Sequence, residues 1–543
     1  MFKPTTRSNS AVLGILVLLA MLSIIAYLVI RTALFFVAPF QWQERLLATF
    51  LLAAEVFILI HGFGYFLNIY HVLQKPQAPL PMATEHQLDS YPPVAIIVSS
   101  YKEPLAVVEN TLTCFYNLTY PNKRLYFLDD TRYDLAWDTP ERMQAYRAGI
   151  DSLCEEIGIN LFRRKWHGAK AGMINDFLDF LAGNQREGFG FVPHGAKGSG
   201  ETEKYIIVFD ADMNPFPDFV EPLVAMMEKN PRLAFVQTPQ YYSNFETNRV
   251  ARASGLQQAV FYEYICEGKS LQDAMFCCGT NVIFRREALM DVGGFDETSV
   301  TEDFATSLKF HMKGWRSTYL NKVCAFGMGP EDLGGYFRQQ FRWALGTVGL
   351  FRSILGELGK DPRRLSVGKW WEYFLSGTHY FVGWVFLILA ACPILYLFTG
   401  VPSFFVYPEI YLLVFTPYLV LSLSIFLGTL EQRHYRPWQM FQGMFLNAIC
   451  FPVYMQASLL GILGVRGSFG ITPKGESHAL PLLRLWPQLL TALIAFAAMV
   501  WGLHRLYYEQ KPFFAILANT LWCFYHFAIL SWVLYFNHPE EEE

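Results

Sequence analysis

Residues 204–212, KYIIVFDAD, run directly from an apolar stretch into two aspartates, Asp210 and Asp212. A short apolar run that ends in polar residues is typical of a buried strand in a parallel sheet. In open α/β sheets, ligands bind at the carboxyl ends of such strands. The two aspartates are either solvated turn residues or a pair of hard oxygen ligands. In the second case they would share a divalent cation with substrate phosphates.

Similar runs flank this strand. VAIIVSSY at 94–101, RLYFLDD at 124–130 and LAFVQTPQ at 233–240 predict further strands, and residues 139–157 predict a helix. Strands that alternate with helices indicate an α/β domain with a mainly parallel sheet. The glycine-rich segment 182–200 lacks the spacing of a phosphate-binding loop, so we expect a flexible insertion there.

The composition points to a membrane protein. Of the 543 residues, 53% are hydrophobic and only 17% are charged, and the net charge of −4 gives no sign of nucleic-acid binding. The nine cysteines include no C-x-x-C pair, so we expect reduced thiols and no zinc site. Stretches long and apolar enough to cross a bilayer are predicted at 11–30, 46–72, 372–399, 409–430, 484–507 and 513–536.

These stretches divide the chain into three predicted regions. Residues 1–75 hold the first membrane helices, 90–360 the α/β domain, and 365–543 a second membrane region. Within the last region, the polar and proline-containing stretch 439–464 has basic residues on both sides, which predicts an interfacial helix and cytoplasmic termini. Glu55 inside the second span is expected to face protein or a water-filled path, or to make a helix–helix hydrogen bond.

Short motifs follow one another along the chain in a fixed order. They are Asp129-Asp130, KAG at 170–172, DAD at 210–212, FCCGTN at 276–281, TED at 301–303, QQFRW at 339–343 and SFGITPKG at 468–475. Together they resemble the signature of family 2 processive glycosyltransferases, and in particular the cellulose synthase and cellulose-synthase-like group. The resemblance implies an α/β domain of the GT-A type inserted between membrane helices, with about six spans plus interfacial helices.

The resemblance also assigns residues to a sugar-nucleotide donor. It places Asp129, Asp130 and Lys170 at the nucleotide, and Asp210 and Asp212 at Mg²⁺ or Mn²⁺. Such an ion stabilises a departing diphosphate electrostatically, and it favours carboxylate and phosphate oxygens. Donor contacts are further expected from the following four residues: Gln339, Arg342, Thr472 and Lys474.

Transfer to a hydroxyl needs a base, and Asp303, with Glu302 beside it, is the expected one. The alternative is that Thr301 simply caps the helix that begins there. Acceptor contacts are expected from the following four residues: Cys278, Gly279, Thr280 and Trp343.

The segment 466–478 resembles a gating loop, which favours glucose as the sugar; the alternative is an ordinary basic loop. We therefore expect a processive, inverting β-glucan synthase that uses UDP-glucose, extends a glucan acceptor and exports the product across the plasma membrane.

The linkage stays open among β-1,4, β-1,3 and mixed β-1,3/1,4, and accessory subunits are neither implied nor excluded. The chain ends shortly after its last span, so no C-terminal domain that binds a cyclic dinucleotide is expected. The alternatives are a single-transfer enzyme acting on a lipid carrier and a non-catalytic transporter or scaffold.

Overall fold

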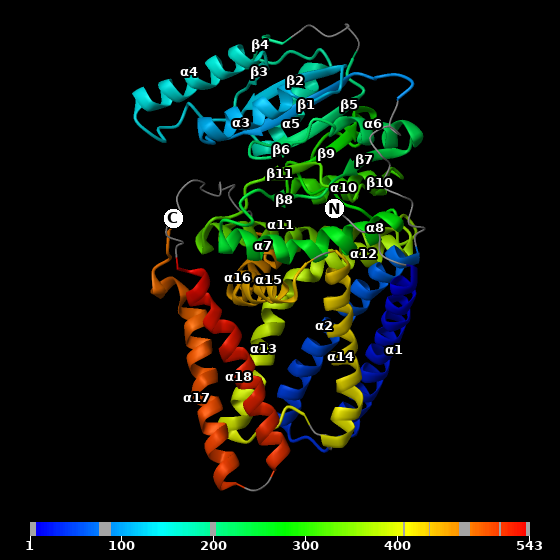
Figure 1. Ribbon diagram of the computed structural model, residues 1–543, viewed down its shortest axis with the longest axis vertical. Helices are drawn as coiled ribbons and strands as arrows, with labels where there is room; N and C mark the ends of the chain where they lie inside the picture. Colours follow the sequence, from blue (N-terminus) through cyan, green and yellow to red (C-terminus); the bar gives the residue numbers. More distant parts are fainter. Residues whose placement is uncertain are drawn as a thin grey trace.

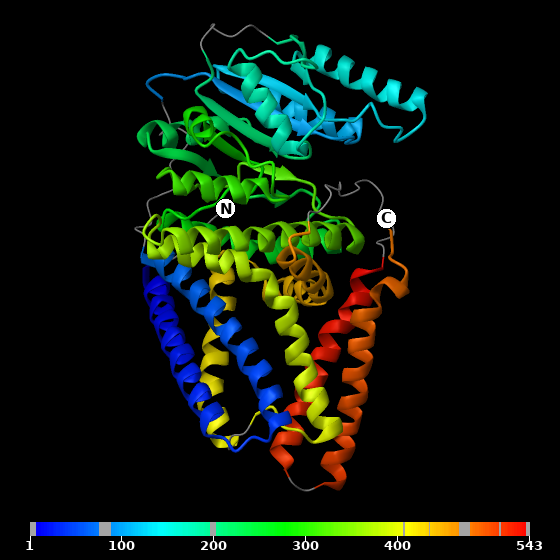
Figure 2. The ribbon, with the colours of Figure 1, turned by 180° about the vertical axis from the view of Figure 1, so that it is seen from behind.

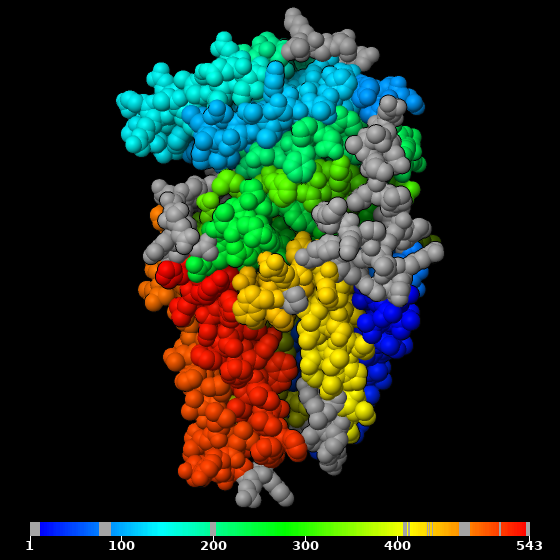
Figure 3. All heavy atoms as spheres, viewed as in Figure 1, coloured from blue at the N-terminus to red at the C-terminus, as the bar shows by residue number. Residues whose placement is uncertain are grey.

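The computed structural model places an α/β domain above a bundle of long helices (Figure 1). It describes residues 7–74, 88–195, 202–404, 408–433, 435–465, 478–509 and 512–538. As spheres, the two parts form one continuous body, in which the domain lies on the upper ends of the long helices (Figure 3).

The α/β domain is built on an eight-stranded sheet with the order β10-β7-β9-β5-β1-β2-β3-β4. The strands are β1 (Val94–Ser100), β2 (Lys123–Asp129), β3 (Asn160–Arg163), β4 (Gly190–Val192), β5 (Tyr205–Asp210), β7 (Leu233–Gln237), β9 (Val282–Arg285) and β10 (Arg316–Tyr319). All neighbours pair in parallel except β9, which is antiparallel to β5 and β7, and β4, which is antiparallel to β3. Strand β4 lies inside the expected flexible insertion, so that expectation was wrong for residues 190–192.

Side chains of the central strands alternate between two cores. In β1, Ile96 and Val98 face one core, and Ala95 and Ile97 face the other. The helices of the domain are α3 (Leu105–Tyr116), α4 (Pro140–Ile157), α5 (Ala169–Leu181), α6 (Val220–Lys229), α9 (Arg286–Asp291) and α10 (Glu302–Met312). Helices α3, α4 and α6 contribute to the first core, while α5, α9 and α10 contribute to the second. Both faces of the sheet are therefore covered, as its unbroken apolar strands require.

The strand order brings polar strand ends together. Strand β1 pairs with β2 on one side and with β5 on the other, so the strands that follow β1 in the sequence lie on both sides of it. The register sets Ser100 opposite Asp129 and Ser99 opposite Asp210. Such a switch point is where open α/β sheets bind ligands. A small second sheet, β6 (Asn214–Pro215), β11 (Ala325–Gly327) and β8 (Tyr241–Tyr242), lies next to this edge.

Two helical segments lie between the domain and the long helices (Figure 1). One is α11 (Leu333–Lys360). The other runs from α7 (Arg249–Val260) through a π-helical turn (Phe261–Ile265) into α8 (Cys266–Leu271). Helix α11 contacts α12 (Val367–Thr378) and α16 (Phe451–Ile462), and α7 contacts α15 (Pro437–Ile449). The domain thus rests directly on the membrane region.

Among the described residues, six helical segments are long and apolar enough to cross a membrane, and the bent pair α15–α16 would be a seventh if it forms one span. They comprise α1 (Arg7–Val37), α2 (Trp42–Gln74), α12 continued through His379–Phe381 into α13 (Val382–Thr399), α14 (Pro408–Gln432), α17 (Trp486–Tyr508, preceded by the 3-10 turn Leu482–Leu485) and α18 (Phe513–Phe536). Helix α13 contacts α2 on one side and α17 and α18 on the other (Figure 2). The chain is therefore a multi-pass membrane protein.

Two local features refine the sequence expectations for this region. The stretch 439–464 forms two helices, α15 and α16, bent by 49° at their junction, rather than one. Pro452 lies in the first turn of α16, where its missing N–H costs nothing. Glu55 of α2 accepts hydrogen bonds from Tyr27 (2.8 Å) and Arg31 (2.7 Å) of α1, so its charge is held in a helix–helix contact.

Candidate active site

A cavity of about 550 Å³ opens at the carboxyl edge of the main sheet, above α11. Most of the side chains proposed from the sequence line it, although they come from strand ends, two helix starts and α11. They are Asp130, Lys170, Asp210, Asp212, Cys278, Gly279, Glu302, Asp303, Gln339, Arg342 and Trp343. Folding therefore brings together, in one pocket, residues that lie as far apart in the sequence as Asp130 and Trp343.

Asp210 ends β5 and Asp212 follows two residues later, beside the ammonium group of Lys170. The Lys170 ammonium contacts the Asp210 carboxylate and donates to the carbonyl oxygen of Gly279 at 2.8 Å. Burial opposes the charge on Lys170, but the carboxylates of Asp210 and Glu302 outweigh it and raise the pKa of the lysine. The pocket thus already favours positive charge next to Asp210.

The same two carboxylates fit a divalent cation that is completed by substrate. The Asp210 side chain is 45% exposed to the cavity, and both residues offer hard oxygen ligands. Within the described part of the chain, no group of three or more His, Cys, Asp or Glu side chains could hold a metal ion. An ion bound here would therefore need phosphate or water oxygens as further ligands.

Asp303 lies in the first turn of α10, one residue after Glu302. Its Oδ1 accepts from the backbone N–H of Phe304 at 2.8 Å. Burial and the negative charge of Glu302 raise the pKa of Asp303 to about 7. Thr301 occupies the N-cap position, but its side chain makes no capping hydrogen bond. The carboxyl group is thus poised to exchange a proton near neutral pH.

The segment before β9 approaches Asp303 closely. Gly279 has φ +84°, and a Cβ there would lie 3.0 Å from Asp303 Oδ2. A larger residue would both strain the backbone and crowd the carboxylate, which explains glycine at this position. Cys278 also lines the cavity, whereas Thr280 is buried and accepts from the Asp210 backbone N–H at 2.9 Å. Thr280 therefore supports β5 and does not line the pocket.

Helix α11 supplies the wall nearest the membrane. Gln339, Arg342 and Trp343 stand three and four residues apart, which places them on one face of the helix. Asp332 caps the helix by accepting from the backbone N–H of Gly335 at 2.6 Å. The wall offers a guanidinium, which suits phosphate oxygens, and an indole face.

The two neighbouring aspartates at the end of β2 differ in position. Asp130 lines the cavity, and burial raises its pKa to about 7 even though Arg164 lies 3.1 Å away. Asp129 does not line it; its Oδ2 accepts from Arg163 Nε at 2.7 Å and from the Tyr133 hydroxyl at 2.9 Å. Asp129 is thus placed to organise the strand end, and its contact with nucleotide stays a prediction. Thr472 and Lys474 lie outside the described residues.

Several residues that line the cavity were not predicted from the sequence. Tyr101 follows β1 directly, Trp166 precedes the KAG motif and is 39% exposed, and Glu297 precedes TED. The Arg132 guanidinium lies 4.7 Å from the ring centre of Trp166. Tyr101 could have been found, because it ends a predicted strand at the binding edge. Trp166 follows β3, which the sequence did not predict, and Glu297 does not directly follow a strand, so only the tertiary structure reveals them.

The site can be compared with known proteins. The pattern "Glycosyl transferase family group 2" matches residues 205–430, and "Glycosyl transferase family 2" matches residues 95–293. "Cellulose synthase 2" of Novacetimonas hansenii is 27% identical over 95% of this chain and 30% of its own length. "Cellulose synthase catalytic subunit [UDP-forming]" of Pseudomonas fluorescens (strain SBW25) is 27% identical over 90% of this chain and 62% of its own length. The chain therefore spans less than two thirds of these curated relatives.

A solved structure supports the fold. A mannosyltransferase from Pyrobaculum calidifontis, in complex with GDP-Man and Mn²⁺, superimposes with a TM-score of 0.51. The match covers 77% of this chain and all of that one, at 17% sequence identity. This likeness extends to the fold alone.

Proposed function

We propose that this chain polymerises glucose from UDP-glucose into a β-glucan. The premise is that it is a family 2 glycosyltransferase of the cellulose-synthase-like group with a GT-A fold. One observation carries the proposal: acidic, basic and aromatic side chains converge on a single cavity whose lower wall, α11, lies on the membrane helices. The sugar acceptor would then be held directly above a route across the membrane.

The donor is proposed to bind between the strand ends and α5. Asp130, Tyr101 and Trp166 offer a carboxylate and two aromatic faces to the nucleoside, and Lys170 and Arg342 offer cations to the diphosphate. Asp210 and Asp212 would hold Mg²⁺ or Mn²⁺, which would offset the charge of the departing diphosphate.

The transfer step is proposed to use Asp303 as base. Its carboxylate would take the proton from the acceptor hydroxyl while that oxygen attacks the anomeric carbon of the donor and UDP leaves from the opposite face. The elevated pKa of Asp303 supports this role, because a base is most effective when its pKa is near the working pH. Trp343 would stack on the terminal sugar of the chain, and Gly279 leaves the base open to the hydroxyl.

The test uses the full chain in inverted membrane vesicles with radiolabelled UDP-glucose and Mn²⁺ or Mg²⁺. We expect a high-molecular-weight product that Asp303→Asn fails to make, because an amide cannot take the proton. Linkage-specific glucanases then identify the bonds.

Three outcomes would contradict this assignment. Polymer formed only from another nucleotide sugar would refute glucose as the sugar but leave the mechanism standing. Single transfer to lipid, or no UDP release from any donor, would refute a processive synthase.

A further inference from the structure

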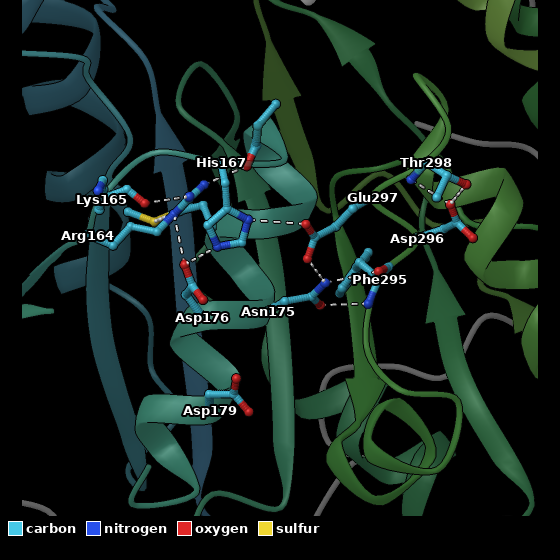
Figure 4. A network of polar contacts seen from close by, with 12 residues as sticks. Arg164, Lys165, His167, Asn175, Asp176, Asp179, Phe295, Asp296, Glu297 and Thr298 are labelled. Atoms are coloured by element: carbon cyan, nitrogen blue, oxygen red, sulfur yellow. Dashed lines mark hydrogen bonds and ion pairs between the residues drawn. The ribbon is translucent and has the colours of Figure 1, made fainter. Parts of the chain in front are cut away.

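A group of polar side chains ties the start of α5 to the segment that leads into α10 (Figure 4). We define the clasp as His167, Asn175, Asp176 and Glu297. We propose that the clasp fixes the position of Asp303 relative to the donor site. The proposal rests on the function proposed above, in which Asp303 acts as the base.

His167 stands between two carboxylates. Its Nδ1 lies 3.2 Å from Glu297 Oε2, and its Nε2 lies 2.7 Å from Asp176 Oδ2. An ionised carboxylate can only accept, so the ring holds both partners by hydrogen bonds when both of its nitrogens carry protons. Charge-assisted hydrogen bonds of this type are stronger than neutral ones. The ring thereby joins the α5 side to residue 297 across 130 positions of sequence.

Asn175 closes the clasp from inside α5. Its Nδ2 donates to Glu297 Oε1 at 2.8 Å and to the carbonyl oxygen of Phe295 at 3.0 Å. Its Oδ1 accepts from the backbone N–H of Phe295 at 2.7 Å. One amide therefore fixes both the backbone and the side chain at the start of the segment.

The backbone is shaped to let Glu297 approach. Gly168 has φ +58°, and a Cβ there would lie only 2.4 Å from Glu297 Oε2. The carboxylate is thus packed against the α5 N-cap glycine, where no other residue would fit.

The clasp joins the walls of the cavity to one another. Residues 297–301 line the cavity and lead directly into Glu302 and Asp303, while α5 carries Lys170, which contacts Asp210. Asp176 also lies 3.5 Å from Arg164, and Arg164 forms an ion pair with Asp130, which lines the cavity at the end of β2. If Glu297 were released, the segment that leads into α10 would lose its tie to His167 and would be held to α5 by the hydrogen bonds between Asn175 and the backbone of Phe295, two residues further from Asp303. A displacement of about 1 Å can cost on the order of 100-fold in rate.

Glu297 itself lines the cavity, so its variants must separate positioning from direct contact with substrate. We would purify the full chain in lipid nanodiscs as wild type, His167→Ala, Glu297→Ala, the double variant and Glu297→Gln. Glu228→Ala is the matched control, because Glu228 also pairs with a basic side chain and is as exposed as Glu297, at 34% for each. The readouts are kcat and KM for UDP release from UDP-glucose with Mn²⁺, and hydrogen–deuterium exchange of peptides covering 295–303.

We expect each alanine variant to lower kcat by about 10- to 100-fold with KM changed by less than about twofold. The double variant should be no worse than either single variant, because both remove one device. Glu297→Gln should recover most of the rate, since its amide oxygen still accepts from Asn175 and its amide N–H can donate to Nδ1 of a neutral His167 ring. Exchange at 295–303 should rise in the alanine variants and stay unchanged in the control.

Three results would overturn the proposal: multiplicative losses in the double variant, a rise confined to KM, or unchanged exchange at 295–303. If the wild type releases no UDP, the proposed function fails, and the exchange measurement alone then decides whether the clasp restrains the segment.

Discussion

Lys269 and Glu372 form a buried ion pair where the domain meets the membrane helices, and breaking it should be costly. Lys269 Nζ on α8 donates to Glu372 Oε2 on α12 at 2.5 Å, and the two side chains are 4% and 1% exposed. Asn68 of α2 and Gln272 each donate to Glu372 Oε1 at 3.1 Å, and Ser376 accepts from Lys269 at 3.0 Å. The perturbation is Lys269→Met, which keeps the volume of the stem and removes the charge.

The burial sets the expected magnitude. With the lysine gone, the carboxylate keeps two amide donors but no counter-charge in a site nearly closed to water. Stranding one member of a buried pair costs about 3–5 kcal/mol, whereas replacing both members by apolar residues is often close to neutral. Lys269→Met should therefore destabilise by about 3–5 kcal/mol, and Lys269→Met with Glu372→Leu should recover most of this loss.

The assay is unfolding in mixed micelles by titration with SDS, followed by tryptophan fluorescence, with all variants in one detergent. Lys204→Met is the control, because Lys204 pairs with Glu228 at 2.6 Å on the surface, where such a pair contributes less than about 1 kcal/mol. If Lys269→Met costs no more than this control, or if the double variant is the least stable of the set, the reasoning from burial is wrong.

Three further predictions concern the pocket and its support. Because burial and Glu302 raise the pKa of Asp303 to about 7 and only the ionised form accepts a proton, kcat should rise with pH through about 7 and then level; a flat profile from about pH 5 upward would contradict this. Asp210→Asn and Asp212→Asn should each raise the Mn²⁺ concentration needed for half-maximal UDP release by at least about tenfold, and an unchanged metal titration would refute the proposed ligands. Gly268→Ala should destabilise by about 1–3 kcal/mol in the SDS titration, because the added Cβ would lie 2.3 Å from Asn68 Oδ1; wild-type stability would mean that α2 and α8 separate freely.

Local patterns in the sequence were sufficient for four strands of the main sheet, for the membrane helices and for most of the pocket. The apolar runs predicted β1, β2, β5 and β7 but not β9, which lies between two of them. The apolar stretches predicted the six candidate spans found among the described residues, because this signal too depends on residues close together in the chain. The motif order predicted the fold and the similarity to family 2 glycosyltransferases that the comparisons found. The lining residues Asp210, Asp212 and Asp303 followed from it, since strand ends and helix starts meet at one edge of such a sheet.

The tertiary structure decided what local patterns leave open. Asp129 and Asp130 are adjacent in sequence, yet one accepts from Arg163 behind the pocket and the other lines it, because successive residues at a strand end point to opposite sides. The contact between His167 and Glu297 depends on how α5 and the segment before α10 pack. The residues that neighbour either one in the sequence do not predict this contact. Local chemistry therefore determined the pocket's residue types and approximate place. Long-range packing determined which carboxylates face the pocket and what holds them there.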